Sequence, residues 1–438
     1  MTYANLSQLP LTSGGPMHRI FTPLPLVALS ALAAAPARAD DAPAPQVAVS
    51  GEVRIREEVL RNLYSPADPS GENNLEYAHM RSRARIDADV HPNLAVVIEL
   101  QDVRILGEEG STVADTEGVD LKRGTIVVRN PGGHPLTLEL GRFVLAYGDQ
   151  RIIGHLEWFD QGRTYDGARL SLKPAGYFAD VFGVRVRETL ADEQDHHVAG
   201  VYAGATDWIP DGAVEAYAIY WDDSLEAMGE MDTGTTGFTT AGARAAVRRA
   251  DLVASVEAAV QLGRLRGDDL MAFGAVAAAD YTFASLPAKL TVGGGVAYGS
   301  GDSDPTDGDA GTFQTLLPTN HLHYGYADLA SWSNHLSVRA SVGAAPVDGL
   351  KLKLDYHHLR LADPAGGWFN AGGALVRAGN ADASSHLGDE IDVTAVWTPM
   401  PHLALLFGLS EFVPGGFVDD TGGGNAETYG YAQARATF

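Results

Sequence analysis

The sequence predicts an all-β fold, namely a transmembrane antiparallel β-barrel of about 18 strands with short periplasmic turns and long extracellular loops. Three observations predict it: a two-residue hydrophobic alternation along the chain, connections that alternate between short and long, and an N-terminal export segment. No later stretch approaches the roughly 18 consecutive apolar residues that a spanning helix needs. Strands are therefore the expected membrane-crossing elements, and a soluble β-sandwich or β-solenoid is the less favoured alternative.

The first 39 residues predict a targeting segment. An apolar run from Ile20 to Leu32 follows the basic Arg19, and Ala37-Arg38-Ala39 has the small-x-small pattern of a signal-peptide cleavage site. A retained membrane anchor is less favoured, because prolines interrupt a run that is shorter than the roughly 20 residues of a spanning helix. We expect an N-terminal extension at residues 1–16, a signal peptide at 17–39 cleaved near Ala39, and a single barrel domain at 40–438.

The alternation is clearest in the segment from Tyr77 to Val90. Successive side chains of a strand point to opposite faces, so a period of two predicts one apolar face and one charged face. The even positions are apolar or small, and the odd positions carry His79, Arg81, Arg83, Arg85, Asp87 and Asp89. Residues 47–56, 350–355 and 403–409 repeat the pattern. The last alternating segment ends in Phe438, which resembles the carboxyl-terminal signal of outer-membrane proteins.

Eighteen strand segments are expected in order along the chain. They begin near residues 46, 77, 94, 119, 136, 163, 177, 195, 213, 237, 251, 270, 287, 332, 349, 387, 402 and 428. Short turns such as those at 91–93, 173–176, 345–348 and 399–401 interleave with long connections near 61–76, 106–118, 148–162, 300–329, 363–386 and 413–427. An even number of strands returns both termini to the periplasmic side. The connection at 300–329 is long enough to fold inward as a plug, although its residues do not require it.

Three regions depart from a simple alternation. Ala241–Gly263 is alanine-rich and also suits a helix, but its larger side chains keep the phase of a strand. The phase flips at Gly141 and at His357-His358, and both flips are interpreted as β-bulges. A metal pair formed by the two adjacent histidines is the less favoured alternative, because neighbouring residues of a strand face opposite ways.

Charge is segregated along the chain. The formal net charge is -25, yet the cations cluster on strand faces, the long connections carry Asp and Glu, and no Lys or Arg occurs from Leu290 to Val338. A cation at the bilayer midplane costs roughly 2–4 kcal/mol, so the cations are expected to point into the barrel. The paired or grouped cations are Arg54, Arg56, Arg81, Arg83, Arg85, Arg185, Arg187, Lys351 and Lys353.

These basic faces predict either a surface that binds anions or a set of ion pairs that stiffens the wall. Only five of the 31 basic residues are lysines, and the planar guanidinium group of arginine binds carboxylates and phosphates through two hydrogen bonds. Alternatively, the arginines pair with Asp87, Asp89 and other inward carboxylates and stiffen the wall, and both roles can hold together. The absence of cysteine excludes disulfides and thiolate chemistry. The acidic loop at 302–309 predicts solvated surface or loose divalent-cation bridging to lipopolysaccharide, because it lacks the spacing of a helix-loop-helix calcium site.

Five linked motifs resemble the alginate export family of outer-membrane proteins. They are GRFVLAYGDQRIIGHLEWFDQGRTYDGARL at 141–170, FQTLLPTNHLHYGYADL at 313–329, LKLDYHHLRLADPAGGWFNAGG at 352–373, HLGDEIDVTA at 386–395 and FVPGGFV at 412–418. The resemblance implies a monomeric barrel with an arginine-lined lumen that carries the polyuronate alginate outward. On the first motif it places Arg142, Arg151, Arg163 and Arg169 at the pore or its mouth, with Asp149 and Asp166 as their carboxylate partners.

The sequence therefore predicts an outer-membrane channel for anionic solutes, by resemblance an exporter of alginate or a similar acidic polysaccharide. A porin for uptake of small acids or sugars is the alternative within transport, and a structural barrel is another. A hydrolase that uses His196, His197 or His321 is disfavoured, because the chain has no G-x-S-x-G nucleophile motif. We expect no catalytic residue, cofactor, metal or nucleic-acid partner. The expected partners are outer-membrane lipid, lipopolysaccharide, the anionic solute and periplasmic secretion proteins.

Overall fold

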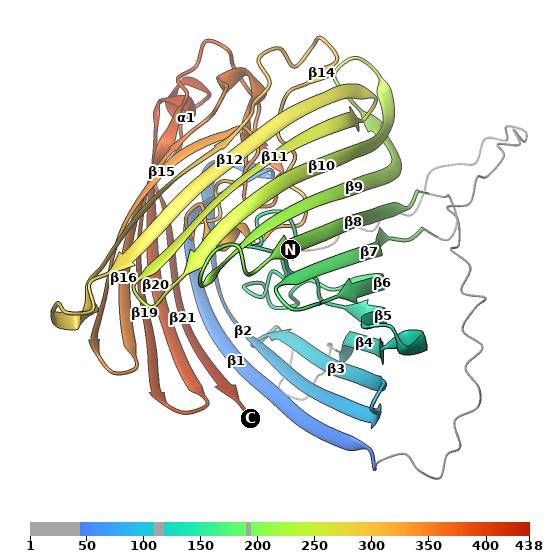
Figure 1. Ribbon diagram of the computed structural model, residues 1–438. Coiled ribbons are helices and arrows are strands. Elements are labelled where there is room, and N and C mark those ends of the chain that lie inside the picture. The colour runs from blue at the N-terminus through green and yellow to red at the C-terminus, as the bar shows by residue number, and fades with distance from the viewer. Residues whose placement is uncertain (1–43, 109–117, 190–193) are drawn as a thin grey trace, which may run out of the picture. The chain divides into compact units, whose positions relative to one another are not determined.

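A computed structural model describes residues 44–108, 118–189 and 194–438, and these residues form a closed antiparallel barrel (Figure 1). The barrel wall has 18 strands. The first and last strands pair with each other, with Arg54 opposite Arg435, and this pairing closes the sheet. The fold class is therefore the one that the hydrophobic alternation predicts. The expected signal peptide and its cleavage near Ala39 fall outside the described residues.

The wall strands follow one another around the barrel in chain order. They are β1 (Gln46–Ser65), β2 (Asp68–His91), β3 (Leu94–Ile105), β4 (Asp120–Arg129), β5 (Leu136–Phe143), β6 (Tyr165–Leu172), β7 (Tyr177–Arg187), β8 (His196–Ala205), β9 (Gly212–Met228), β10 (Thr233–Arg248), β11 (Leu252–Leu265), β12 (Asp268–Thr282), β13 (Thr291–Gly299), β15 (His335–Val347), β16 (Leu350–Arg360), β19 (His386–Met400), β20 (Leu403–Pro414) and β21 (Glu427–Thr437).

Short elements lie in the connections between these strands. They are the strands β14 (Asp309–Ala310), β17 (Trp368–Phe369) and β18 (Leu375–Arg377), the 3₁₀ helices η2 (Pro131–Gly133), η3 (Pro287–Lys289), η4 (Asn320–Leu322) and η5 (Pro364–Gly366), and the α-helix α1 (Gly416–Asp420). None of the helices in the described ranges has the length and apolar character needed to cross a membrane.

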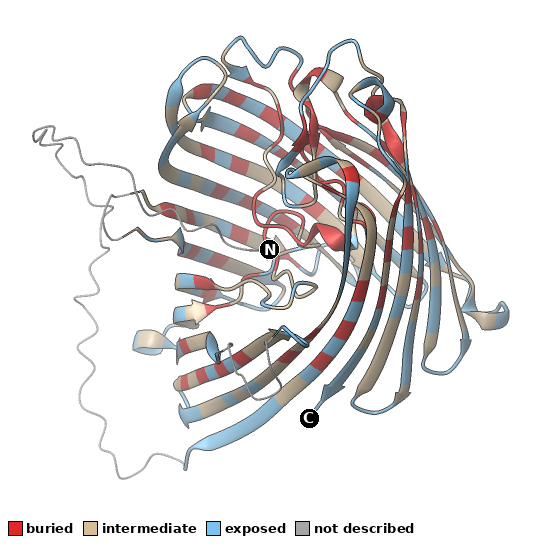
Figure 2. Ribbon diagram, turned by 180° about the vertical axis from the view of Figure 1, so that it is seen from behind, coloured by how far each residue is buried: buried red, intermediate tan, exposed pale blue. Residues whose placement is uncertain are grey.

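Alternate residues of the wall strands face opposite sides, which Figure 2 shows as bands of buried and exposed residues. On β1, Val53 and Ile55 are 41% and 46% exposed, whereas Arg54 and Arg56 are each 3% exposed. The exposed residues on other strands are also largely apolar, as at Val393 of β19. Apolar side chains therefore clothe the outside of the barrel and charged ones face its interior, because hydrocarbon accepts the first kind and excludes the second.

The largest departure from the expected strand positions is at β2. It begins at Asp68 rather than near 77, so the long connection expected at 61–76 is wrong, and β1 and β2 instead continue as a hairpin in which Ser65 is opposite Asp68. A hairpin that extends beyond the bilayer carries polar residues on both faces, so hydrophobic alternation does not reveal it. The alanine-rich region 241–263 lies in strands β10 and β11, as its phase predicts.

The bulges expected at Gly141 and at His357-His358 are not found at these residues, and the prediction was wrong at both positions for one reason, although β16 and β19 shift register further on, between Leu359 and Arg360. β5 stays in register with β4 and β6 through Gly141, and β16 stays in register with its two neighbours through both histidines. Phe143 and Leu359 keep the inward parity of their strands and are fully buried. Apolar residues face inward here because the barrel interior at this height contains packed protein.

Two connections fold into the barrel and pack there. The first inward connection is 144–164, between β5 and β6, and the second inward connection is 300–334, between β13 and β15. They pair with each other where Ile153 bridges Leu317, and the Leu317 carbonyl accepts a hydrogen bond of 2.7 Å from the backbone of Gly154. The inward fold that the sequence left open for 300–329 is thus observed. The buried apolar cluster that results includes Leu145, Phe313, Tyr324, Trp332, Leu359 and Phe412.

Candidate functional site

The β1–β2 wall carries the densest group of predicted arginines, and the first inward connection covers it. Arg54 forms an ion pair with Asp160 of this connection, and Arg54 Nη1 donates to the Glu157 carbonyl oxygen at 2.9 Å. The Arg56 guanidinium group lies 4.0 Å from the centre of the Trp158 ring and donates to the Trp158 carbonyl oxygen at 2.9 Å. These contacts bury both guanidinium groups beneath the connection.

Arg81 and Arg83 of β2 are neutralised beneath the same connection. A Glu157 carboxylate oxygen lies 3.0 Å from Arg81 Nη1 and 2.5 Å from Arg83 Nη1, and a Glu52 oxygen lies 2.5 Å from Arg81 Nη2. Burial raises the pKa of the Glu157 carboxyl, but the charges of Arg83 and Arg81 lower it by more, so this pKa lies below its ordinary value. Glu157 is therefore ionised at neutral pH, and the wall is a compensated cluster of ion pairs.

The other predicted cations of the strands are also paired, with the exception of Lys351, which is exposed on β16 with no ion pair among the described residues. The pairs are Arg85–Asp87, Arg142–Asp166, Arg169–Glu139, Arg185–Glu188, Arg187–Asp223 and Lys353–Asp355. Pairing with nearby carboxylates is therefore the common state of the basic strand faces.

Three of the predicted pore residues lie on the outer face of the barrel. Arg142 is directly opposite Asp166, and Asp166 shares its strand parity with Leu170, which is exposed. Arg185 likewise shares its parity with the exposed Val181. Arg142, Asp166 and Arg185 therefore point away from the interior. The lumen position predicted for Arg185, and the position at the pore or its mouth that the resemblance implied for Arg142 with its partner Asp166, are corrected to the outer rim.

A cavity of about 510 Å³ lies inside the barrel between both inward connections and strands β9 to β12 and β15. Its size falls in the range of about 300–1,000 Å³ that is usual for small-ligand sites. Arg244 Nη1 lies 2.6 Å from Glu215, and Arg244 Nη2 lies 2.5 Å from Asp149. Arg339 Nη2 lies 2.9 Å from Asp280. The charged and titratable residues that line the cavity are Asp149, Arg151, Asp211, Glu215, Arg244, Arg248, Asp280, His323 and Arg339.

Arg151 differs from Arg244 and Arg339 of this cavity. It is 8% exposed, and its guanidinium carbon lies 5.4 Å from the centre of the Tyr324 ring. Within the described part of the chain, its Nε and Nη1 atoms are buried without a hydrogen-bond partner, and no carboxylate forms an ion pair with it. A buried guanidinium group with unused donors can offer them to an anion.

Asp149 and His323 hold the two inward connections together beside Arg151. His323 Nε2 lies 2.7 Å from the Asp149 carbonyl oxygen, which can only accept, so Nε2 carries the proton. Burial lowers the pKa of His323 well below its ordinary value, and the charge of Arg151 adds to this effect. Burial raises the pKa of the Asp149 carboxyl, but the Ser255 hydrogen bond and the Arg244 charge lower it by more. His323 is therefore neutral and Asp149 is charged at neutral pH.

The last predicted residue of the first motif, Arg163, joins the two inward connections. Its Nη1 atom donates to the carbonyl oxygen of Gly154 at 3.2 Å and to that of Pro318 at 2.9 Å. Sequence reasoning missed Arg244 and Arg339, because it selected cations that recur in pairs. Arg339 is the one Lys or Arg of β15, and Arg244 shares the inward parity of β10 with Arg248, on strands rich in small and apolar residues. That parity is the signal that identifies them.

Known proteins share both the sequence pattern and the fold of this barrel. A profile of the alginate export family matches residues 46–432, which is most of the chain. The chain belongs to the alginate export family. A search of curated protein sequences finds no significant match to this alginate export family protein.

Crystal structures of OprD-like porins from Pseudomonas aeruginosa have a similar fold. OpdL is 13% identical to this chain with a TM-score of 0.58, and the match covers 90% of this chain and 98% of OpdL. OprD is 11% identical with a TM-score of 0.58, covering 89% and 95%. OccK2, solved in complex with glucuronate, is 12% identical with a TM-score of 0.57, covering 90% and 96%. At these identities the likeness concerns the fold alone.

Family and fold together make this alginate export family protein an outer-membrane channel of a Gram-negative bacterium. The apolar outer face of its wall is in contact with outer-membrane lipid and lipopolysaccharide, and solutes pass through the barrel.

Proposed function

We propose that this barrel conducts anionic, uronate-type solutes across the outer membrane and that Arg151 is the group that contacts them in the lumen. The observation that carries the proposal is the pair of unused donors on Arg151 beside the cavity. Arg244 and Arg339 line the same cavity, but carboxylates already hold them. An arriving carboxylate therefore gains more from Arg151 than from Arg244 or Arg339, because Arg151 gives up no carboxylate partner to bind it.

The arrangement of neighbours supports transit rather than tight binding. Arg151 and the exposed Arg248 line the cavity without an ion pair among the described residues, beside the ion-paired Arg244 and Arg339. An anion is therefore offered two available guanidinium groups and several exchangeable contacts. Conduction requires binding that is favourable enough for entry and weak enough for exit. The arginines of the β1–β2 wall are assigned a structural role in this proposal, because Glu157 and Asp160 already neutralise them.

The chemistry of the relatives agrees with a carboxylated sugar as the solute. The family is named for export of alginate, a polyuronate, and the OccK2 structure of similar fold contains glucuronate, a uronic acid. Each sugar ring of either compound carries one carboxylate. A carboxylate is the planar anion that a guanidinium group binds through two hydrogen bonds. We propose that the same ligand chemistry applies here.

The packed interior favours a second candidate, a porin that admits small acids. Phe313 and Trp332 of the second inward connection are fully buried, and the cavity, which Leu322 and His323 of the same connection line, is of small-molecule size. In this conformation the cavity suits a single sugar acid. Passage of a polymer requires the two inward connections to move. The two candidate functions therefore differ in whether these connections leave the lumen.

We propose no catalytic role for the chain. His321, one of the candidate histidines for a hydrolase, stacks on Trp158 with ring centres 3.9 Å apart, and its Nδ1 atom lies 3.1 Å from Asp328. These are the contacts of a histidine that packs one inward connection against the other, and they support a structural role.

Recordings from single channels in planar bilayers test the proposal. In a potassium chloride gradient the reversal potential should show preference for chloride, and glucuronate should reduce the current in a concentration-dependent manner. Cation preference would overturn the proposal. Block by glucuronate without block by alginate oligomers over a wide concentration range would favour the small-acid porin over the polysaccharide exporter.

A further inference from the structure

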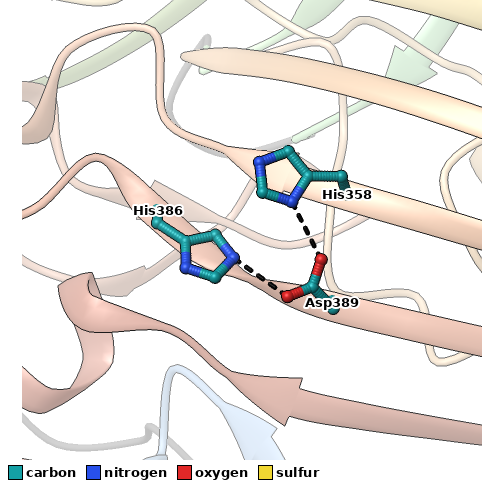
Figure 3. A group of neighbouring side chains, drawn as sticks. All are labelled: His358, His386 and Asp389. Atoms are coloured by element: carbon teal, nitrogen blue, oxygen red, sulfur yellow. Dashed lines mark hydrogen bonds and ion pairs between the residues drawn. The ribbon is translucent and has the colours of Figure 1, made fainter.

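Three side chains outside the lumen, His358, His386 and Asp389, meet on the outer face of the barrel (Figure 3). Asp389 Oδ1 lies 2.8 Å from His358 Nδ1, and Asp389 Oδ2 lies 3.1 Å from His386 Nε2. One potential ligand atom from each residue lies within 4.8 Å of the other two. Each side chain is about one-third exposed, so an ion can reach the group from solvent.

The strand register explains why these residues converge. His358 of β16 is directly opposite Asp389 of β19, so both point outward. In a regular strand, residues three apart face opposite sides, which would turn His386 away from Asp389. The register shifts between Leu359 and Arg360, where His386 pairs with Arg360, and this irregularity returns His386 to the face of Asp389. The sequence motif HLGDE therefore supplies two ligands from one strand, and β16 supplies the third.

The adjacent histidines of β16 do not share a site, as the sequence predicts. His357 faces the interior and is 4% exposed, whereas His358 faces outward. The partner of His358 is instead His386, whose ring stacks on it with centres 4.8 Å apart. Two imidazole rings thus lie side by side and share one carboxylate, although the residues are 28 positions apart in the chain.

The carboxylate between the rings is held in place by a third contact. The Tyr356 hydroxyl donates to Asp389 Oδ1 at 2.6 Å. Such a hydrogen bond to a ligating carboxylate fixes its orientation and is a usual feature of protein metal sites. Tyr356 and Ile391 are the next outward-facing residues toward the membrane on their strands, and the exposed Val338 and Val413 lie directly opposite His358 and Asp389. The group therefore lies at the edge of the apolar part of the wall, at the end that bears the long connections.

We propose that His358, His386 and Asp389 bind one divalent transition-metal ion of the zinc class at the outer rim of the barrel. Two imidazole nitrogens and one carboxylate oxygen are a donor set that suits Zn²⁺ and leaves a fourth position for water. With metal–ligand bonds of about 2.0–2.1 Å, the ligand atoms of a tetrahedral zinc site lie roughly 3.3 Å apart. The separations of 2.8 Å and 3.1 Å involve the two different oxygens of Asp389, and one ligand atom from each residue lies within 4.8 Å of the other two. Binding therefore requires the three side chains to turn until their ligand atoms reach this spacing.

A metal ion here would fasten one of the long connections at its end. His386 is the first residue of β19, where the connection 361–385 rejoins the wall. That connection also contacts the region after β20 through Arg377, whose guanidinium group donates to the carbonyl oxygens of Val418 and Gly423. The ion would link the start of β19 to β16 from outside and oppose fraying of the sheet at this rim.

Zinc titration of the purified, tag-free barrel in detergent tests the proposal. Calorimetry with Zn²⁺ alone should show one site per chain, and Co²⁺ at the same site should give the intense visible absorption of tetrahedral coordination. His386→Asn and Asp389→Asn should each weaken Zn²⁺ binding by at least the roughly 10- to 100-fold that changes around a metal site cost. His134→Asn is the matched control, because His134 is exposed in a short turn remote in sequence from this group.

The outcomes separate a metal site from a group of ion pairs. Zinc binding that is lost in His386→Asn and retained in His134→Asn supports the site, provided that circular dichroism shows the same strand content in both variants. Absence of stoichiometric Zn²⁺ binding in the unaltered protein would overturn the proposal. Undiminished binding in both His386→Asn and Asp389→Asn would overturn it equally.

Discussion

The arginines of the β1–β2 wall and those of the cavity face the same interior, yet they differ in what holds them. Arg54 and Arg81 are covered by the first inward connection, whose Asp160 and Glu157 neutralise them. Arg151 belongs to that same connection and keeps two donors unused beside the cavity. The density of cations on a strand therefore does not measure their availability to a ligand. The path of the connection that covers the strand decides it.

Removing the charge of Asp160 should have the largest effect on stability. In Asp160→Asn, Arg54 remains buried without its charged partner, and breaking a buried ion pair from one side costs about 3–5 kcal/mol. We expect the free energy of unfolding to fall by about 3 kcal/mol, measured by denaturant titration with tryptophan fluorescence. Asp348→Asn, an exposed turn residue, is the control and should change little. If Asp160→Asn lowered the free energy of unfolding by less than about 1 kcal/mol, the buried wall arginines would not depend on ion pairs with the first inward connection.

Replacing Arg151 should have the largest effect on solute binding. We expect Arg151→Gln to weaken block by glucuronate roughly tenfold or more, because hydrogen bonds to charged groups contribute about 1.5–3 kcal/mol. Stability should not fall, since the substitution removes a buried charge that lacks a carboxylate partner among the described residues. Arg85→Gln is the control, because Asp87 already pairs with Arg85. If the two substitutions weakened block by glucuronate equally, the arginines of the wall and of the cavity would not differ in their availability to the solute.

The two regions should also respond to acid in different pH ranges. The lowered pKa of His323 means that the unfolded chain takes up a proton that the folded chain does not. Its contribution to stability is therefore lost progressively as pH falls below about 6.5, by about 1.4 kcal/mol per pH unit. The lowered carboxyl pKa values of Glu157 and Asp160 preserve the contribution of the wall down to about pH 4. That contribution disappears only as pH falls through the lowered values.

Unfolding measured between pH 6.5 and pH 4.5 checks this order. The slope of the unfolding free energy against pH should be smaller in His323→Gln by about one proton, while other buried histidines keep a slope in both proteins. An identical slope in the variant and the unaltered protein would show that His323 is not neutral in the folded barrel. The cavity region is thus expected to loosen at a higher pH than the wall.

Sequence reasoning succeeded where a residue's environment follows from its immediate neighbours. The alternation around Arg54 and Arg81 placed these side chains opposite the apolar face, and both are 3% exposed in the barrel. The start of β3 at Leu94 follows from the short turn before it. The same reasoning failed at Leu359, which it assigned to a bulge, because an apolar residue on the inward parity has no place in a water-filled barrel. The inward connections that bury Leu359 have no periodicity, so their course leaves no such signal.

Sequence reasoning also failed at the outer rim of the barrel. Arg185 was predicted for the pore because cations avoid hydrocarbon, and the family resemblance implied a place at the pore or its mouth for Arg142. At the strand ends the restriction on cations ends and the outer face becomes polar. Their place on the outer face, where both lie opposite Asp166, is visible only once the strand boundaries are known. His386 is a further case, because its position beside Asp389 depends on a register shift that alternation does not encode.

The sequence by itself determined that the chain forms a closed barrel, how many strands it has and which face of each strand is apolar. It could do so because a period of two is a local property, set by the geometry of the extended backbone at every pair of residues. Only the tertiary structure decided which cations remain available. The partners Arg54 and Asp160 are 106 positions apart, and their meeting depends on where a long connection packs.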